Sequence, residues 1–469
     1  MIIFVIYGNK KRTIEMKRLL TFAIALMMGL SATAQNFDKT LRLDYIFTGS
    51  STETEVSLAK MKSLDGWWGR RVNMDKILLD ANGQVKLYDA ESGDLLYVNT
   101  FSTLFREWQN SEEATRIRKS FEVTLLVPMP EKKAYVTVDL YNDRAELVET
   151  YTHDVDPEDI LIQPVRCNFP SKYIVKSGDS KDCIDIAFVA EGYTAEEADL
   201  FYSECEMAAS SILAHEPFKS LKDRINFVAV AAPSQESGIS IPNKNHWVNT
   251  ALGSHYDTFY SDRYLTTLNI FKLHDALSSV PYEHIIILAN TENYGGGGIY
   301  GQYMLSSTRH AQSKPVIVHE FGHSFAGLAD EYFYDDQYEQ FYFDDIEPWE
   351  PNITTLVNFE SKWQDMMQKE QIVTKADQAA EKKAQRAQME KARAEGKQVA
   401  RPDYSKTKYE VGLYEGAGYL SEGVYRPVPE CRMKINEYPE FCPVCQRAIT
   451  RYIDWNTKPM TEALYDPQR

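Results

Sequence analysis

Hydrophobic and polar residues alternate over the first third of the chain, which is the period of a half-buried β-strand. The alternation is clearest at Leu41, Leu43, Tyr45 and Phe47, and comparable segments recur at residues 85–87, 95–98, 121–127 and 135–141. Asn82-Gly83 and Ser92-Gly93 have the composition of hairpin turns between strands. Several short strands without intervening helices predict an all-β sandwich over residues 35–156.

The pattern changes after the acidic, proline-containing segment 153–159, which we interpret as a linker. Unbroken apolar runs occur at residues 184–190, 225–231 and 285–289, and a helical pattern occupies 195–214. Strands buried on both faces of a parallel sheet have such runs. Residues 157–469 are therefore predicted to form an α/β domain with a mostly parallel mixed sheet. Within it, the Ala-, Lys- and Glu-rich residues 374–395 predict one solvated, charged helix.

The N-terminus has the order of a secretory signal peptide. The segment Met16-Lys17-Arg18, with two basic residues, precedes an apolar run at 19–30 and the small residues Ala32-Thr33-Ala34. We expect residues 1–34 to be removed, with 1–15 an over-extension upstream of the start. The apolar run is short for a bilayer span, so a signal is favoured over a membrane anchor. We therefore expect a secreted, periplasmic or cell-surface protein without stable membrane insertion after signal removal.

The charge of the chain excludes one class of partner. Lys and Arg number 51 against 68 Asp and Glu, a formal net charge of -17. Removing residues 1–34 takes away five Lys or Arg and one Glu, which leaves 46 minus 67, or -21. General nucleic-acid binding needs clustered positive charge, so no nucleic-acid partner is expected. The sequence contains no signal for an oligomeric state.

All six cysteines lie in the C-terminal part of the chain, from Cys167 onward. Export permits disulfides, and three bridges would have 15 connectivities that the sequence does not rank. Cys442 and Cys445 form a CxxC with Cys431 nearby, which could hold a structural metal or act in redox chemistry. Because no second CxxC or flanking histidine completes a zinc knuckle, the sequence favours bridges or buried thiols.

The chemistry of the chain is concentrated in an HExxH motif at residues 319–323. On a helix, His319 and His323 lie one turn apart on the same face, so both imidazoles can bind one zinc ion. Glu320 points away from His319 by about 100°. It can therefore stand beside the bound water as a general base without being a ligand. The alternative is a helix with two packing histidines and a solvated glutamate.

A catalytic zinc site needs a third protein ligand. Gly327 can turn the chain sharply after the helix, and Asp330 and Glu331 follow it. In the commoner extended zincin motif, glycine lies three residues after the second histidine and the ligand three further on. Here the glycine is one residue later, which leaves Asp330 and Glu331 both open. We prefer Asp330 by the Gly-x-x-ligand step, and the other acid could orient an imidazole.

Three further features could belong to the site. Met433 is the best candidate for a methionine turn beneath the metal, or is simply part of the core. Tyr425 could donate a hydrogen bond to the oxyanion of the tetrahedral intermediate, although structural tyrosines are common. The glycine run 295–298 lacks the residues of a phosphate loop and would let the backbone run close to the cleft. The following residues 299–307 would form the edge strand that pairs with a peptide substrate.

These motifs resemble the bacterial IgA-specific metallopeptidase family. The resemblance covers roughly residues 167–453, and the N-terminal sandwich is similar to that family's accessory domain. The shared segments are residues 185–193, Tyr294 with the glycine run, the helix 319–332, residues 411–418, residues 423–427 and Met433. The resemblance implies a zincin endopeptidase with zinc on His319, His323 and an acidic third ligand, and Glu320 as the base. It implies that the helix at 374–395 is an insertion, and it does not transfer IgA as the substrate.

The sequence thus predicts an exported zinc metalloendopeptidase that hydrolyses peptide bonds with a zinc-bound water activated by Glu320. Its partners would be protein or peptide substrates. The alternative is a surface or periplasmic binding protein that acts through the sandwich and has a vestigial zinc site. Trp67, Trp68 and Trp108 could supply a binding surface for that alternative, or they pack in the core.

Overall fold

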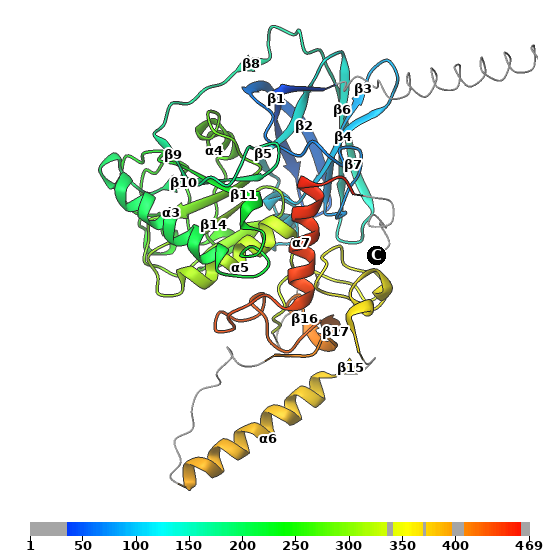
Figure 1. Cartoon of the computed structure of the whole chain (residues 1–469), viewed down its shortest axis with the longest axis vertical. Helices are drawn as coiled ribbons and strands as arrows, with labels where there is room; N and C mark the ends of the chain where they lie inside the picture. Colours follow the sequence, from blue (N-terminus) through cyan, green and yellow to red (C-terminus); the bar gives the residue numbers. More distant parts are fainter. Residues whose placement is uncertain (1–34, 335–340, 369–371, 396–407, 461–469) are drawn as a thin grey trace, which may run out of the picture.

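A computed structural model describes residues 35–334, 341–368, 372–395 and 408–460 of the chain. The predicted signal peptide at residues 1–34 lies outside the described residues. The N-terminal part is rich in β-strands, and a mixed α/β region follows it (Figure 1). Among the described residues, no helix has the length and apolar character needed to cross a membrane.

The N-terminal part contains two four-stranded sheets. Their strand orders are β5-β1-β2-β8 and β4-β3-β6-β7, and all neighbours are antiparallel except β2 and β8. Alternate residues such as Leu43 and Val136 meet in one apolar cluster, because successive side chains of a strand point to opposite faces. The strands are β1 (Gln35–Gly49), β2 (Thr54–Asp65), β3 (Gly83–Asp89), β4 (Leu95–Phe101), β5 (Lys119–Pro130), β6 (Ala134–Tyr141), β7 (Leu147–Val155) and β8 (Gln163–Pro164).

Two local predictions in this region were wrong. Ser92-Gly93 does join the paired strands β3 and β4, but Asn82-Gly83 is no hairpin turn, since β2 and β3 belong to different sheets. The segment interpreted as a linker starts too early, because His153 still belongs to β7 and pairs with Val136. The mostly polar sequence of β7 hides it from a hydrophobic pattern. The division of the chain at residue 156 stays a prediction.

The tryptophans of this region do not form an exposed platform. Trp67 and Trp108 are buried in the core, and Trp68 is half-buried. The indole N–H of Trp108 donates to Glu113, while that of Trp67 donates to the carbonyl of Arg70. Buried indoles with satisfied N–H groups are typical of core packing. The core alternative for these side chains is therefore confirmed for Trp67 and Trp108.

The C-terminal part is built around a six-stranded sheet with the order β13-β14-β12-β10-β11-β9. The four inner strands are parallel, and the edge strands β9 and β13 are antiparallel, which confirms the predicted mixed sheet. The central strands are entirely buried, as their unbroken apolar runs predicted. The strands are β9 (Ser171–Val175), β10 (Ile184–Glu191), β11 (Ile225–Val230), β12 (His284–Ala289), β13 (Gly296–Ile299) and β14 (Tyr303–Ser307).

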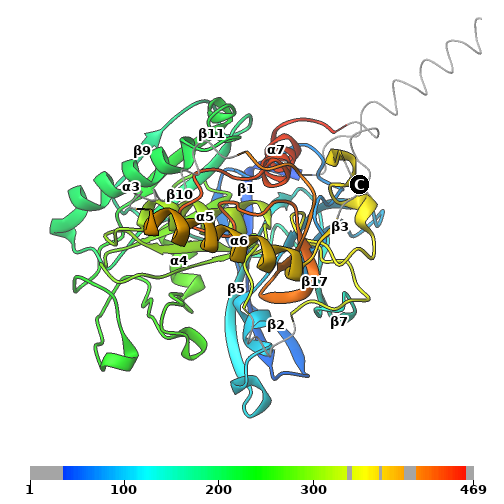
Figure 2. The ribbon, with the colours of Figure 1, turned by 90° about the horizontal axis from the view of Figure 1, so that it is seen from below.

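The two faces of this sheet pack against different parts of the molecule. Ile186 and Phe188 belong to one cluster with the helices α3, α5 and α7, whereas Ala187 and Val189 belong to the cluster that includes α4 and the N-terminal sheets. Figure 2 shows α3 and α4 on opposite sides of the sheet. The helices are α2 (Leu104–Gln109), α3 (Ala198–Leu213), α4 (Ile270–Ala276), α5 (Ser313–Ala326), α6 (Lys375–Ala394) and α7 (Pro443–Thr457).

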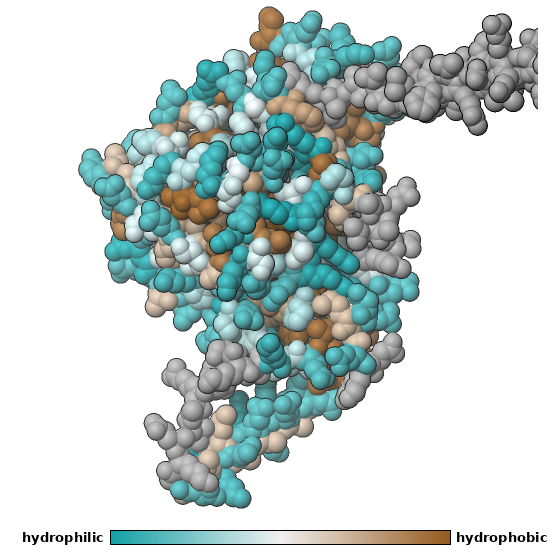
Figure 3. Space-filling model, in the orientation of Figure 1, coloured by the Kyte–Doolittle hydropathy of each residue, from teal (hydrophilic) through white to brown (hydrophobic). Residues whose placement is uncertain are grey.

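The segment predicted as a charged helix is α6, and none of its residues is buried. It extends away from the rest of the molecule and carries hydrophilic side chains (Figures 1 and 3). Thr374 and Asp377 form a capping box at its start, which satisfies free amides of the first turn. The remaining elements are β15 (Ile372–Val373), β16 (Leu413–Ala417), β17 (Leu420–Arg426), and short 3-10 turns at Glu113–Thr115, Ala195–Glu197, Lys222–Arg224, Pro242–Lys244, Thr258–Tyr260, Phe359–Ser361 and Gln364–Met366.

Candidate metal centre

The HExxH motif lies in the C-terminal half of helix α5. Ile317, Phe321 and Phe325 are buried and fix one side of the helix in the core. His319 and His323, one turn apart, keep 13% and 15% of their side chains exposed on the opposite side. The helix ends at Gly327, whose φ of 62° is left-handed, and its N–H donates to the carbonyl of His323. This glycine reverses the chain so that the next residues return toward the histidines.

The returning chain brings Asp330 to both histidines. The Oδ1 atom of Asp330 lies 3.0 Å from Nε2 of His319 and 3.2 Å from Nε2 of His323. The two Nε2 atoms are 3.1 Å apart. Nitrogen and oxygen ligands at about 2.1 Å from a tetrahedral zinc lie roughly 3.4 Å from one another. The three atoms could therefore hold one metal ion.

The hydrogen bonds of the imidazoles fit this donor set. Nδ1 of His319 lies 3.0 Å from the carbonyl of Arg432, and Nδ1 of His323 lies 2.5 Å from the carbonyl of Leu328. A carbonyl only accepts, so Nδ1 carries a hydrogen, and each ring in its neutral form presents the Nε2 lone pair to a metal. Asp330 Oδ1 is buried and accepts no conventional hydrogen bond among the described residues. All three atoms thus remain available to a cation.

The electrostatics of the cluster couple these groups strongly. Burial alone would raise the pKa of Asp330, but the neighbouring imidazoles outweigh it and hold that pKa well below its usual range. Burial alone would lower the pKa of His323, yet Asp330 and Glu320 raise it to about 9. Burial raises the pKa of Glu320, and the two histidines oppose this shift. A carboxylate with a raised pKa is suited to accept and return a proton near neutral pH.

Glu320 lies against the edge strand β13 of the sheet. The predicted edge strand, residues 299–307, was misplaced, since β14 within it pairs with both β12 and β13. The glycines of β13 permit close approach to the helix. A Cβ on Gly298 would lie 2.3 Å from the carbonyl oxygen of Glu320, and one on Gly296 would lie 3.2 Å from its Oε1. Only glycine lets this strand and the motif helix pack so closely.

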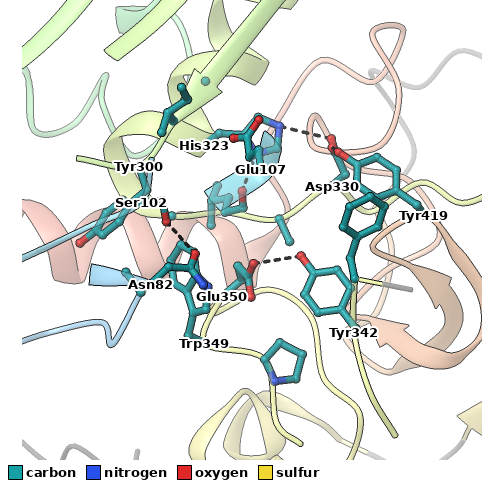
Figure 4. Close-up of a pocket in the computed structure, with 18 of the residues that line it drawn as sticks. Asn82, Ser102, Glu107, Tyr300, His323, Asp330, Tyr342, Trp349, Glu350 and Tyr419 are labelled. Carbon is teal, nitrogen blue, oxygen red and sulfur yellow. Dashed lines mark hydrogen bonds and ion pairs between the residues drawn. The ribbon is translucent and has the colours of Figure 1, made fainter. Parts of the chain in front are cut away.

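The donor cluster lies in a cleft of about 1670 Å³ formed by both parts of the molecule. Glu107 of α2 points from the N-terminal part toward His323 and Asp330 (Figure 4). The hydroxyl of Tyr264 donates to Glu107. Burial raises the pKa of Glu107 to about 7 despite this hydrogen bond. The cleft is larger than a typical small-molecule pocket, which suits an extended ligand.

The alternative third ligand, Glu331, faces away from the histidines. Its Oε1 accepts hydrogen bonds from Asn352 and from the thiol of Cys445. Its backbone N–H donates to the carbonyl of Met433 over 2.8 Å. Met433 is fully buried, and its sulfur packs against Gly322 beneath the motif helix, 2.7 Å from where a Cβ would lie. The structure therefore brings together His319, His323 and Asp330, and places Met433 below them.

Tyr425 lies on β17, where its backbone pairs with Glu415 and Thr354. Among the described residues it is not one of those that line the cleft. Tyr419 lies there instead, and its hydroxyl donates to Oδ2 of Asp330 over 2.5 Å. The sequence signal that could have identified Tyr419 as a site residue was its position directly after the glycine-rich segment 411–418. Glu107 belongs to an ordinary amphipathic helix and has no sequence signal.

The fold and this site define the class of the molecule. A helix that presents two histidines, with a carboxylate returning to them and a glutamate beside them, has the donor set of a metal-dependent hydrolase. Residues 173–453 match the family model described as IgA Peptidase M64, and residues 33–152 match the model described as Peptidase M64 N-terminus. The chain therefore belongs to the IgA Peptidase M64 family, a family of metallopeptidases. A comparison with curated proteins finds no match.

Proposed function

We propose that this protein is an exported zinc endopeptidase with a zincin-like catalytic domain. The single observation that carries the proposal is the convergence of His319, His323 and Asp330, with three donor atoms 3.0–3.2 Å apart. Two imidazoles and one carboxylate form a donor set that zinc uses in catalytic sites with an open position. Export is supported by the signal-like order of residues 16–34.

Zinc, when bound, would polarise the scissile carbonyl and acidify a neighbouring water. Glu320 would take a proton from that water and deliver it to the departing amine. Its raised pKa supports both transfers. A carboxyl group with an ordinary pKa is almost fully deprotonated at neutral pH, so it would rarely hold the proton that the departing amine needs. Arg432 and Leu328 orient the imidazoles through their carbonyls, and Tyr419 orients Asp330.

A peptide substrate would lie along β13, the edge strand beside Glu320. An edge strand offers unpaired backbone groups to an extended peptide. The backbone of Tyr264 forms a β-bridge with Gly296 at one end of β13. We therefore expect the substrate backbone to pair with the other end, at Gly298 and Ile299. The cleft lining from both parts of the molecule would then contact side chains of the substrate.

The test is cleavage of a proteome-derived peptide library by the purified mature chain, read by sequencing the new N-termini. We expect cleavage that stops with a zinc chelator and returns with zinc. Glu320→Gln should lower the rate by at least about 100-fold while zinc content is unchanged, since general-base removal costs this much. The exposed Glu422→Gln is the matched control for the lost charge and should cleave normally.

A wild-type chain that holds zinc in the cleft but cleaves nothing would contradict the proposal, as would an undiminished rate for Glu320→Gln. Binding of glycans or proteins without cleavage would then favour the alternative binding function. Export is tested separately by sequencing the N-terminus of the chain recovered outside the cytoplasm. We expect it to begin at Gln35.

A further inference from the structure

A second group of metal-ligand side chains lies next to the candidate catalytic centre. Glu331, Cys431, Cys442 and Cys445 are all buried, and their ligand atoms lie within 4.8 Å of one another. None of the four is needed for the hydrolysis described above. We propose that these residues form a structural zinc site of three thiolates and one carboxylate, which holds the loops around the catalytic centre in place.

The spacing of the sulfur atoms fits a shared ion. The Sγ atoms of Cys431 and Cys445 are 3.9 Å apart, and Cys445 Sγ lies 3.1 Å from Oε1 of Glu331. Two thiolates at about 2.3 Å from a tetrahedral zinc lie roughly 3.8 Å apart. Thiolate-rich donor sets select zinc over the harder divalent cations. The four donors are supplied by the chain itself, which is the closed arrangement of structural rather than catalytic zinc sites.

Backbone amides surround the sulfurs in a way that favours thiolates. The N–H of Cys442 donates to Cys431 Sγ over 3.2 Å, and the N–H of Cys445 donates to Cys442 Sγ over 3.5 Å. Cys442 is also the N-cap of the 15-residue helix α7. The positive end of a helix stabilises negative charge, and the thiolate is the form that binds metal.

Glu331 provides an observation that is independent of the cysteines. It is 0% exposed, and among the described residues no Lys, Arg or His lies within ion-pair distance of it. Its Oε1 is hydrogen bonded, but its Oε2 is buried without a partner in the described part of the chain. A buried carboxylate oxygen without a partner is costly, and a bound cation would satisfy it.

The surrounding charges balance such a site. Three thiolates and a carboxylate carry four negative charges, and Zn²⁺ offsets two of them. Two buried arginines lie close enough to interact with the remainder, Arg426 with Glu331 and Arg432 with Cys431. On zinc binding, the protons held by the thiols and by the Glu331 carboxyl leave to solvent, and no redox step is involved.

The site would join two chain segments that build the catalytic centre. Glu331 follows Asp330 directly, and Cys431 precedes Arg432, whose carbonyl accepts from His319. The N–H of Glu331 also bonds to the carbonyl of Met433. A metal that binds both segments and the start of α7 therefore restrains the third ligand and one histidine at the same time.

The experiment is zinc content per chain, measured by mass spectrometry on the purified full chain after dialysis against a weak chelator. We expect about two zinc ions in the wild type and about one in the double variant His319→Ala/His323→Ala. Cys431→Ser/Cys445→Ser should lose the other zinc. Cys205→Ser is the matched control, because Cys205 is fully buried on α3 outside the cluster, and it should keep both.

A second measurement covers the case in which the cysteine variant does not fold. The double histidine variant, loaded with Co²⁺ alone, should show thiolate-to-cobalt absorption in the near ultraviolet. Its three clustered thiols should resist alkylation until a strong chelator is added. The proposal is overturned if that variant holds no metal, or if unreduced protein has Cys431, Cys442 or Cys445 in disulfides. Because the catalytic histidines are absent from this variant, the result does not depend on the proposed peptidase activity.

Discussion

Two clusters of potential metal ligands lie side by side in this molecule and differ in their access to solvent. His319, His323 and Asp330 line an open cleft, with 6–15% of each side chain exposed. Glu331 and the three cysteines beside it are 0–3% exposed. The consecutive acids Asp330 and Glu331 belong to different clusters. The surroundings of each carboxylate follow from the direction of its side chain. The side chain of Asp330 faces the cleft, and that of Glu331 faces the core.

The largest effects are expected from replacing the two neighbouring acids one at a time. Asp330→Asn should lower peptidase activity by more than about 100-fold. Loss of a metal ligand is expected to cost at least as much activity as loss of a group that only hydrogen bonds to a ligand. It should keep the zinc of the cysteine cluster. Glu331→Gln should instead weaken zinc binding at the cysteines and lower the unfolding temperature. Metal content, activity and thermal unfolding of both variants check this prediction.

If both variants lose the same zinc ion and the same activity, the two clusters do not work separately. The comparison would then reduce to one metal centre with an outer layer of supporting groups.

A smaller effect is expected from Tyr419→Phe, which removes the hydroxyl that donates to Asp330. Loss of such a supporting hydrogen bond typically costs about 10–100-fold in metal affinity or activity. Tyr425→Phe is the matched comparison, because Tyr425 lies outside the cleft lining among the described residues. Zinc titration and steady-state cleavage of both variants would measure the difference. A larger loss for Tyr425→Phe would restore its sequence-based role as an oxyanion donor.

The smallest expected effect is a pH dependence of the free energy of unfolding that arises from Glu107 in the cleft. Burial raises the pKa of Glu107 to about 7, above its ordinary 4.5, so the folded chain holds this proton more tightly than the unfolded chain. The free energy of unfolding that depends on Glu107 should therefore fall as pH rises from about 4.5 to 7, and level off above. The loss is on the order of 2 kcal/mol, allowing for its partial exposure.

Glu107→Gln should lack this pH dependence, whereas the exposed Glu112→Gln should keep it. The measurement is denaturant unfolding of chelator-treated protein across that pH range, because a bound cation would itself lower the pKa of Glu107. Identical pH profiles for the wild type and Glu107→Gln would show that Glu107 is charged in the folded cleft at all these values.

Much of the local structure could be predicted because it depends on local periodicity. The apolar runs at 184–190, 225–231 and 285–289 became the buried strands β10, β11 and β12. The failures occurred where the period was weak. Strand β7 is mostly polar because much of it faces solvent, and it was interpreted partly as a linker. The edge strand was placed at 299–307, because nothing local distinguishes an edge strand from its inner neighbour.

The sequence by itself determined the motif helix, because a four-residue spacing on an α-helix places His319 and His323 on one face whatever the rest of the fold does. It also indicated that Gly327 ends the helix and that an acid follows. Only the tertiary structure placed Asp330 rather than Glu331 beside the histidines, gathered the cysteines around Glu331, and brought Glu107 and Tyr419 to the cleft. Those contacts join residues tens to hundreds of positions apart, and they depend on packing rather than on local spacing.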